Sequence, residues 1–147
     1  MVSGGNRQVA KPHTHLLKPK LLSNNLDVKN MPLIKVQSSV DSPEPGAVEG
    51  LLKVLSAKLA KHLGKPESYV MTAFEPNVAM TFAGTVEPVC YIEVKSIGTM
   101  SPAQTQAMSQ DFCQIVNEKL GVPAKRIYIE FADAKGAMWG WNSSTFG

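Results

Sequence analysis

The chain has 147 residues, of which 44% are apolar and 18% are charged, a composition typical of one globular domain of ordinary size. No apolar run reaches the ~18–20 residues that a membrane-spanning helix needs, so we expect no insertion into a membrane. The two cysteines, Cys90 and Cys113, do not form a CxxC pair. They suit a reducing compartment, in which buried packing cysteines are more common than disulfides.

The net charge of +3 is divided unevenly along the chain. Residues 1–30 carry five basic side chains and one acidic one, a net charge of +4. Residues 31–147 carry ten basic and eleven acidic side chains, a net charge of −1. Because this longer part is nearly neutral, we expect no nucleic-acid partner.

The first residues differ in composition from the rest. They are polar, basic and interrupted by Pro12 and Pro19, and their leucines are too scattered for the apolar core of a signal peptide. We expect residues 1–31 to be an N-terminal extension that is disordered or lies upstream of the true start, with residues 32–147 as the domain. This favours a cytoplasmic protein; secretion without a signal peptide and organelle targeting by residues 1–30 stay open.

The first predicted unit is a strand, a helix and a returning strand. Leu33–Val40 alternates β-forming residues, as in a strand with one buried face. Pro45 suits the first position of a helix, and Gly64 is typical of a helix C-terminus. Tyr69–Glu75 predicts the returning strand. The apolar residues with helical spacing between these limits are Val48, Leu51, Leu52, Leu55, Leu59 and Leu63.

The second predicted unit has the same order. Val89–Ile97 predicts a strand, and Ser101 predicts a helix N-cap, with Pro102 at the first helical position. Gln104 completes the pattern of a capping box. Arg126–Phe131 is rich in β-branched and aromatic residues and predicts the last strand. The apolar stripe of the helix is Met108, Phe112, Ile115, Val116 and Leu120.

The two units match each other at a shift of 57 residues without a gap. We therefore predict an α/β fold of two pseudo-symmetric βαβ units, a four-stranded mixed sheet with two helices on one face. A homotrimer whose sheets surround a central axis would cover the other face. Val78–Ala83 and Trp139–Trp141 are predicted as short extra strands that pair between subunits. The matching pairs include Ser39 and Ser96, Pro45 and Pro102, Leu63 and Leu120, Gly64 and Gly121, Pro66 and Pro123, and Phe74 and Phe131.

Met31 and Pro32 come directly before the first predicted strand. If the mature chain begins at Pro32, its nitrogen is a free secondary amine. An ordinary α-amino group titrates at roughly 7.7–8.0, and an apolar site lowers that pKa. Enolisation needs one such base to remove a proton beside a carbonyl and return it elsewhere. In a longer chain the nitrogen is an amide, and Pro32 is then a proline that opens an edge strand. Both interpretations stay open on these residues alone.

Several separated motifs carry a resemblance to a known family. They are Met31-Pro32, Gly64-Lys65-Pro66-Glu67, Ser96-Ile97-Gly98, Tyr128 and the stretch 140–146. In this order and at these distances, they resemble the family of macrophage migration inhibitory factor and D-dopachrome tautomerase, over the whole of residues 32–147. The resemblance implies a homotrimer with three active sites between subunits. It also implies an isomerase that interconverts keto and enol forms, with phenylpyruvate-like enols and dopachrome as test substrates, and that no metal or cofactor takes part.

The resemblance also assigns roles to individual residues. Pro32 matches the catalytic proline, and Lys65 the lysine that binds the substrate carboxylate. Ile97 matches the isoleucine whose backbone contacts the ligand, and Tyr128 the tyrosine contributed across the subunit boundary. Lys65 and Tyr128 also have ordinary structural interpretations, as a lysine at a helix end and a half-buried strand tyrosine. The residues that would wall the pocket are Tyr69, Trp139, Trp141 and Phe146.

The sequence departs from the family pattern in two features. Glu130 stands where the animal cytokine has asparagine, and its charge would repel an anionic substrate if it faced the pocket. Val89 and Ile92 stand in place of a redox CxxC pair, so disulfide exchange is not supported. The thirty-residue extension and Glu130 leave an alternative function open: a cytokine-like or other protein-binding homologue, with a protein receptor and a vestigial active site.

Overall fold

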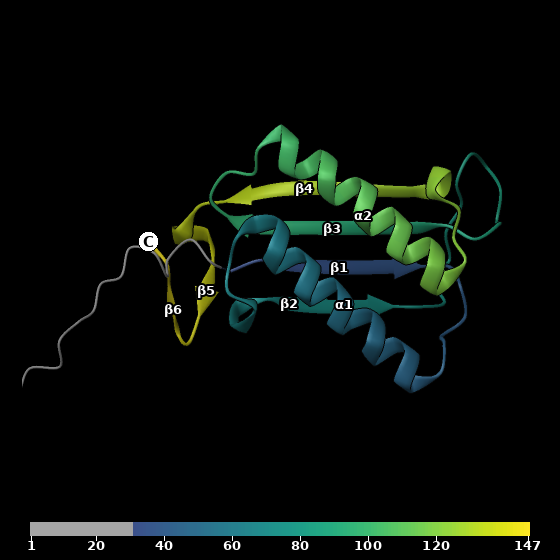
Figure 1. Ribbon diagram of the computed structural model, residues 1–147, viewed down its shortest axis with the longest axis horizontal. Coiled ribbons are helices and arrows are strands. Elements are labelled where there is room, and N and C mark those ends of the chain that lie inside the picture. The colour runs from purple at the N-terminus through teal and green to yellow at the C-terminus, as the bar shows by residue number, and fades with distance from the viewer. Residues whose placement is uncertain (1–30) are drawn as a thin grey trace, which may run out of the picture.

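Each half of the described chain folds as a strand, a helix and a strand. The computed structural model describes residues 31–147, and Figure 1 shows both helices on one face of a four-stranded sheet. The prediction of two βαβ units with both helices on one face is confirmed. The elements are β1 (Leu33–Ser38), α1 (Pro45–Leu63), β2 (Met71–Glu75), β3 (Cys90–Ile97), α2 (Pro102–Leu120), β4 (Ile127–Ala134), β5 (Gly140–Trp141) and β6 (Ser144–Thr145).

The sheet has the strand order β2-β1-β3-β4. β1 pairs with β2 and β3 pairs with β4 in parallel, whereas β1 and β3 pair antiparallel at the centre and join the two halves. Leu33 lies opposite both Met71 and Lys95, and Lys95 lies opposite Ala132. The start of β1 therefore lies at the same end of the sheet as the ends of β3 and β4. Figure 1 shows the β5–β6 hairpin at that end.

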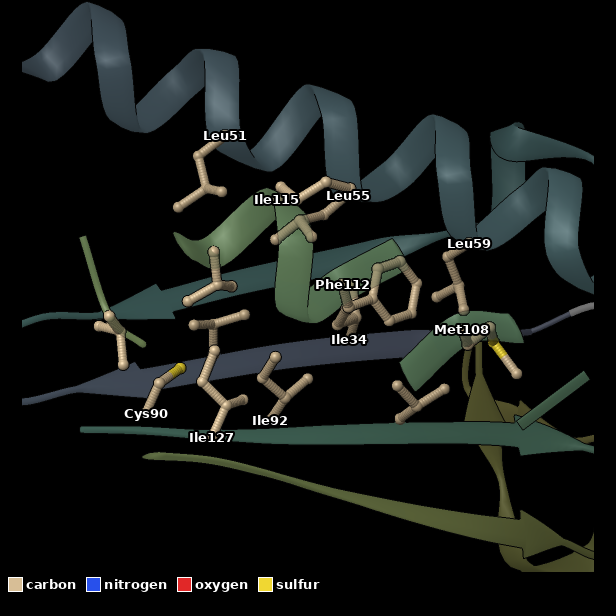
Figure 2. Packing of buried hydrophobic residues seen from close by; sticks show 14 residues of the cluster. Ile34, Leu51, Leu55, Leu59, Cys90, Ile92, Met108, Phe112, Ile115 and Ile127 are labelled. Atoms are coloured by element: carbon tan, nitrogen blue, oxygen red, sulfur yellow. The ribbon is translucent and has the colours of Figure 1, made fainter. Parts of the chain in front are cut away.

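Alternation along the strands sends one set of side chains toward the helices. Ile34 and Val36 of β1 and Ile92 and Val94 of β3 are fully buried there. Figure 2 shows side chains of the helices packed against those of the strands in this buried core. The helical side chains of this core include Leu51, Leu55, Leu59, Met108, Phe112 and Val116.

Within residues 31–147, no helix has the length and hydropathy needed to cross a membrane.

The opposite face of the sheet is not covered by any element of residues 31–147. It carries the alternate residues of each strand, and most of them are polar or charged. A second copy of the chain could cover this face, as the predicted homotrimer requires, and the trimer stays a prediction. The side chains on this face include Lys35, Gln37, Tyr91, Glu93, Lys95, Tyr128 and Glu130.

The predicted extra strands are formed only in part within one chain, and their pairing between subunits stays a prediction. Val78–Ala83 forms no strand; Phe82 makes only one isolated bridge, to Thr85. A strand needs a partner edge, and within the described residues this loop finds none. Of the predicted Trp139–Trp141, only Gly140–Trp141 is a strand, and it pairs with Ser144–Thr145 in a hairpin. Residues 1–30, predicted as an extension or a targeting segment, lie outside the described residues.

The two helices end alike but begin differently. Gly64 and Gly121 end them in the left-handed conformation, at φ 62° and 71°. At the start of α2, Ser101 Oγ accepts a hydrogen bond from the Gln104 backbone N–H (3.1 Å), and the Gln104 side chain accepts one from the Ser101 N–H (2.9 Å). Glu44 at the start of α1 makes no such side-chain bond. The predicted capping box of α2 is confirmed.

We expect Ser101→Ala to lower the free energy of unfolding by about 1 kcal/mol, because it leaves the Gln104 N–H without its side-chain acceptor. Urea denaturation at one fixed protein concentration measures this. Ser42→Ala is the matched control, since Ser42 is exposed and precedes α1. It should change the stability by less than about 0.5 kcal/mol. Equal losses in both variants would contradict the role of the cap.

Candidate active site

Pro32 lies directly before β1 and is fully buried. Its carbonyl accepts a hydrogen bond from the Met71 N–H (3.0 Å), which ties it to the neighbouring strand. Met31 precedes it and is only 5% exposed. With Met31 attached, the nitrogen of Pro32 is an amide and has no basicity. The position is therefore that of a base only in a chain that begins at Pro32.

The ammonium of Lys65 is bonded to the end of β3, the strand that pairs with β1 next to Pro32. Lys65 follows the last turn of α1, and its Nζ donates to Ser96 Oγ (2.6 Å) and to the Ile97 carbonyl (2.8 Å). The pairing of Leu33 with Lys95, extended by one residue, sets Pro32 opposite Ser96. The structure thus brings together three of the predicted site residues, Pro32, Lys65 and Ile97.

Ser96 is a member of this site to which the sequence analysis assigned no role. It is 1% exposed at the end of β3, and its hydroxyl accepts from the Lys65 ammonium. Its place in the motif Ser96-Ile97-Gly98 was the available signal. Within residues 31–147, Ser96 and Ile97 use two of the three N–H donors of the ammonium and leave one for a further acceptor.

The protonation of Lys65 depends on its surroundings. Its partial burial lowers the pKa of the amine below the ordinary lysine value, and the negative charge of Asp133 raises it in part. Desolvation disfavours the charged form of an amine, whereas a nearby carboxylate favours it. The ammonium is thus lost at a lower pH than that of an exposed lysine.

A cavity of about 450 Å³ lies beside Pro32. Its lining includes both chain neighbours of Pro32, Met31 and Leu33, and the aromatic rings of Tyr69, Trp139 and Trp141. The rings of Tyr69 and Trp141 meet edge to face, with centroids 6.2 Å apart. Three of the four predicted wall residues therefore line one apolar cavity that could accept an aromatic group.

A second cavity has a volume of about 570 Å³. It is lined by Ile97, Asp133, Lys135 and Phe146, among others. Phe146 stacks on Trp141 with a centroid separation of 5.9 Å. Phe146, the fourth predicted wall residue, thus lines a different cavity from Tyr69, Trp139 and Trp141, although its ring contacts Trp141.

Tyr128 lies away from these residues within one chain. Lys95 lies opposite Leu33 at the start of β1, and it pairs with Ala132 of β4. Tyr128 is four residues before Ala132 in β4 and pairs with Tyr91. Four residues of a strand span about 13 Å. Tyr128 is 68% exposed, on the face of the sheet that the helices leave uncovered. A site that contains both Pro32 and Tyr128 therefore needs more than one copy of the chain.

Glu130 occupies the same uncovered face. Its carboxylate accepts a hydrogen bond from the Tyr91 hydroxyl, which also lies 3.2 Å from Glu93 Oε1. These two carboxylates raise the pKa of the Tyr91 phenol, with the Glu130 bond as the largest cause. Within one chain Glu130 thus faces Tyr91 and lines neither of the two cavities near Pro32.

The cysteines offer no reactive thiolate at neutral pH. Burial raises the pKa of Cys90 to about 12 and raises that of Cys113 as well. Both thiols are free. Val89 and Ile92, at the positions of the absent redox pair, are buried apolar residues.

Comparisons with known proteins identify the family of the chain. The family model described as macrophage migration inhibitory factor matches residues 31–147. Among solved structures, the macrophage migration inhibitory factor homologue from Prochlorococcus marinus is 51% identical, with a TM-score of 0.74, and the match covers 78% of this chain and 99% of that one.

Curated relatives match the same part of the chain. Macrophage migration inhibitory factor from Meriones unguiculatus is 36% identical over 116 residues, 79% of this chain and 99% of the relative. The macrophage migration inhibitory factor homolog of Brugia malayi is 33% identical over 117 residues, 80% of this chain and all of the relative. The resemblance drawn from the motifs is confirmed: the chain belongs to the macrophage migration inhibitory factor family.

Proposed function

We propose that the chain, in a form that begins at Pro32, is a cofactor-free keto–enol tautomerase of small aromatic keto or enol acids, similar to a phenylpyruvate tautomerase or dopachrome isomerase. One observation carries the proposal. The Lys65 ammonium is bonded to Ser96, opposite Pro32, and an aromatic cavity lies beside the same proline. A base, an anion-binding group and an apolar wall would then meet at one end of the sheet.

In this proposal the free nitrogen of Pro32 is the acid and base. Burial lowers the pKa of an amine, so that it is unprotonated near neutral pH. It removes the proton from the carbon beside the substrate carbonyl or from the enol hydroxyl, and returns a proton to the other position. The proline ring holds the nitrogen in one direction. No other group needs to change its charge.

Lys65 and the aromatic residues would orient the substrate. The remaining N–H donor of the Lys65 ammonium would bind the carboxylate of the substrate, a charge-assisted bond. The aromatic ring of the substrate would enter the cavity lined by Tyr69, Trp139 and Trp141. In a homotrimer, Tyr128 of a neighbouring subunit would complete the site, and the uncovered faces of the sheets would be buried against one another.

A second candidate function is supported by the peptide bond between Met31 and Pro32. It makes the nitrogen of Pro32 an amide, so the chain with residues 1–31 attached has no base at this position. A protein that keeps this segment would then be a cytokine-like or other protein-binding homologue with a vestigial active site and a protein receptor. The state of the N-terminus separates the two functions.

The first test compares two forms of the protein, each verified by intact mass. We expect a chain that begins at Pro32 to ketonise or enolise phenylpyruvate. The full chain should be at least about 100-fold slower, because it lacks the base. Pro32→Gly in the short form should lose activity by a similar factor, since a primary amine replaces the ring nitrogen. Equal activity of the short and full forms, or full activity of Pro32→Gly, would contradict the role of Pro32 as the base. No activity in either form would favour the second function.

The second test uses the pKa of Lys65. Because burial lowers this pKa, we expect the KM for phenylpyruvate to rise with pH below the ordinary lysine value of 10.5. Lys65→Arg should remove that rise, since a guanidinium stays charged. Asp133→Asn should move it to lower pH, because it removes the charge that raises the pKa. Lys61→Ala, at an exposed position in the last turn of α1, is the control. A KM that is independent of Lys65 would contradict its role.

A further inference from the structure

Arg126 is a buried cation just before β4. It is 6% exposed, and all the acceptors recorded for its guanidinium are backbone carbonyls of one loop. Its Nε donates to Pro88 (2.9 Å), its Nη1 to Phe82 (3.2 Å) and its Nη2 to Glu87 (2.9 Å) and Thr85 (3.3 Å). Within residues 31–147 it forms no ion pair with a carboxylate. A charge buried in this way is retained only while these bonds hold, so the guanidinium and the loop order each other.

The loop closes around the guanidinium in a tight turn. Phe82 and Thr85 exchange two backbone hydrogen bonds, of 3.1 and 3.0 Å. Between them, Ala83 and Gly84 have positive φ angles of 50° and 73°. Gly84 suits such a two-residue turn, whereas a non-glycine residue such as Ala83 rarely adopts a positive φ. The guanidinium of Arg126 donates charge-assisted hydrogen bonds to the carbonyls of Phe82 and Thr85 and so helps to hold the turn.

The side chain of Phe82 links this loop to Tyr128. The Arg126 guanidinium lies 5.4 Å from the centroid of the Phe82 ring. The same ring meets Tyr128 edge to face, with centroids 5.1 Å apart and an angle of 64° between the planes. Within one chain Tyr128 is 68% exposed, and its contact with the Phe82 ring limits the rotation of its side chain.

We propose that Arg126 is a positioning residue of the tautomerase site, which acts through Phe82 to hold Tyr128 in one orientation. This inference rests on the proposed function, in which Tyr128 reaches the site of a neighbouring subunit. Arg126 itself touches no substrate. These contacts order Tyr128 within its own chain before it meets the neighbouring subunit and the ligand, so binding loses less side-chain freedom.

The test is a double-mutant cycle in the chain that begins at Pro32. Phe82→Leu and Arg126→Lys should each raise the KM for phenylpyruvate about three- to tenfold, in the range of coupling between contacting residues, with kcat nearly unchanged. In a Tyr128→Ala background the same substitutions should leave KM unchanged. A merely structural role would raise KM equally in both backgrounds. Lys125→Ala, an exposed neighbour of Arg126, is the control and should change nothing.

A second measurement does not depend on activity. The chain has three tyrosines, and in a tyrosine-labelled sample the ring signals of Tyr128 should shift in Phe82→Leu and Arg126→Lys, while those of Tyr69 stay in place. Unmoved Tyr128 signals, or a Tyr128→Ala variant with unchanged KM, would overturn the inference and leave the proposed function standing. A wild-type chain that begins at Pro32 and shows no tautomerase activity would reject both.

Discussion

The antiparallel pairing of β1 with β3 determines where every other group of the site lies. Each βαβ unit would otherwise have its own two-stranded sheet, too small to be stable alone. The central pair merges them into one sheet with one buried face, onto which both helices pack. Because the pairing is antiparallel, the start of β1 meets the end of β3. Pro32 therefore comes to lie beside Ser96, although 64 positions separate them in the sequence.

The site is assembled from groups that each have a structural reason for their position. Lys65 follows the glycine that ends α1, so its side chain extends from the helix end toward the sheet. Its bonds to Ser96 and Ile97 offset the partial loss of hydration of the ammonium. Trp141 lies on a short hairpin and contacts both Tyr69 and Phe146. The apolar wall thus depends on the C-terminal segment.

Much of the fold could be predicted from the sequence, because the signals are local. The helices are marked by prolines at their starts and by Gly64 and Gly121 at their ends, and the strands alternate. What escaped prediction depends on partners distant in the sequence. Val78–Ala83 has β-forming residues, but within the described part of the chain it pairs with neither edge strand of the sheet, β2 or β4.

Only the site residues that belong to a sequence motif could be predicted. Lys65 and Ile97 lie together as the motifs imply, because helix end and strand end are adjacent in the topology. The use of Ser96 as an acceptor, the burial of Met31 and the contact of Arg126 with four carbonyls depend on side-chain packing. Such packing leaves no periodic signal in a sequence.

The distance between Pro32 and Tyr128 within one chain has a consequence for the energetics of catalysis. If the two residues serve one substrate, they must come from different copies, and the substrate then binds only to associated chains. By mass action, substrate would favour association, and dilution would weaken substrate binding. The subunit equilibrium and the substrate affinity would then be thermodynamically linked, so each would have to be measured at a stated concentration of the other component.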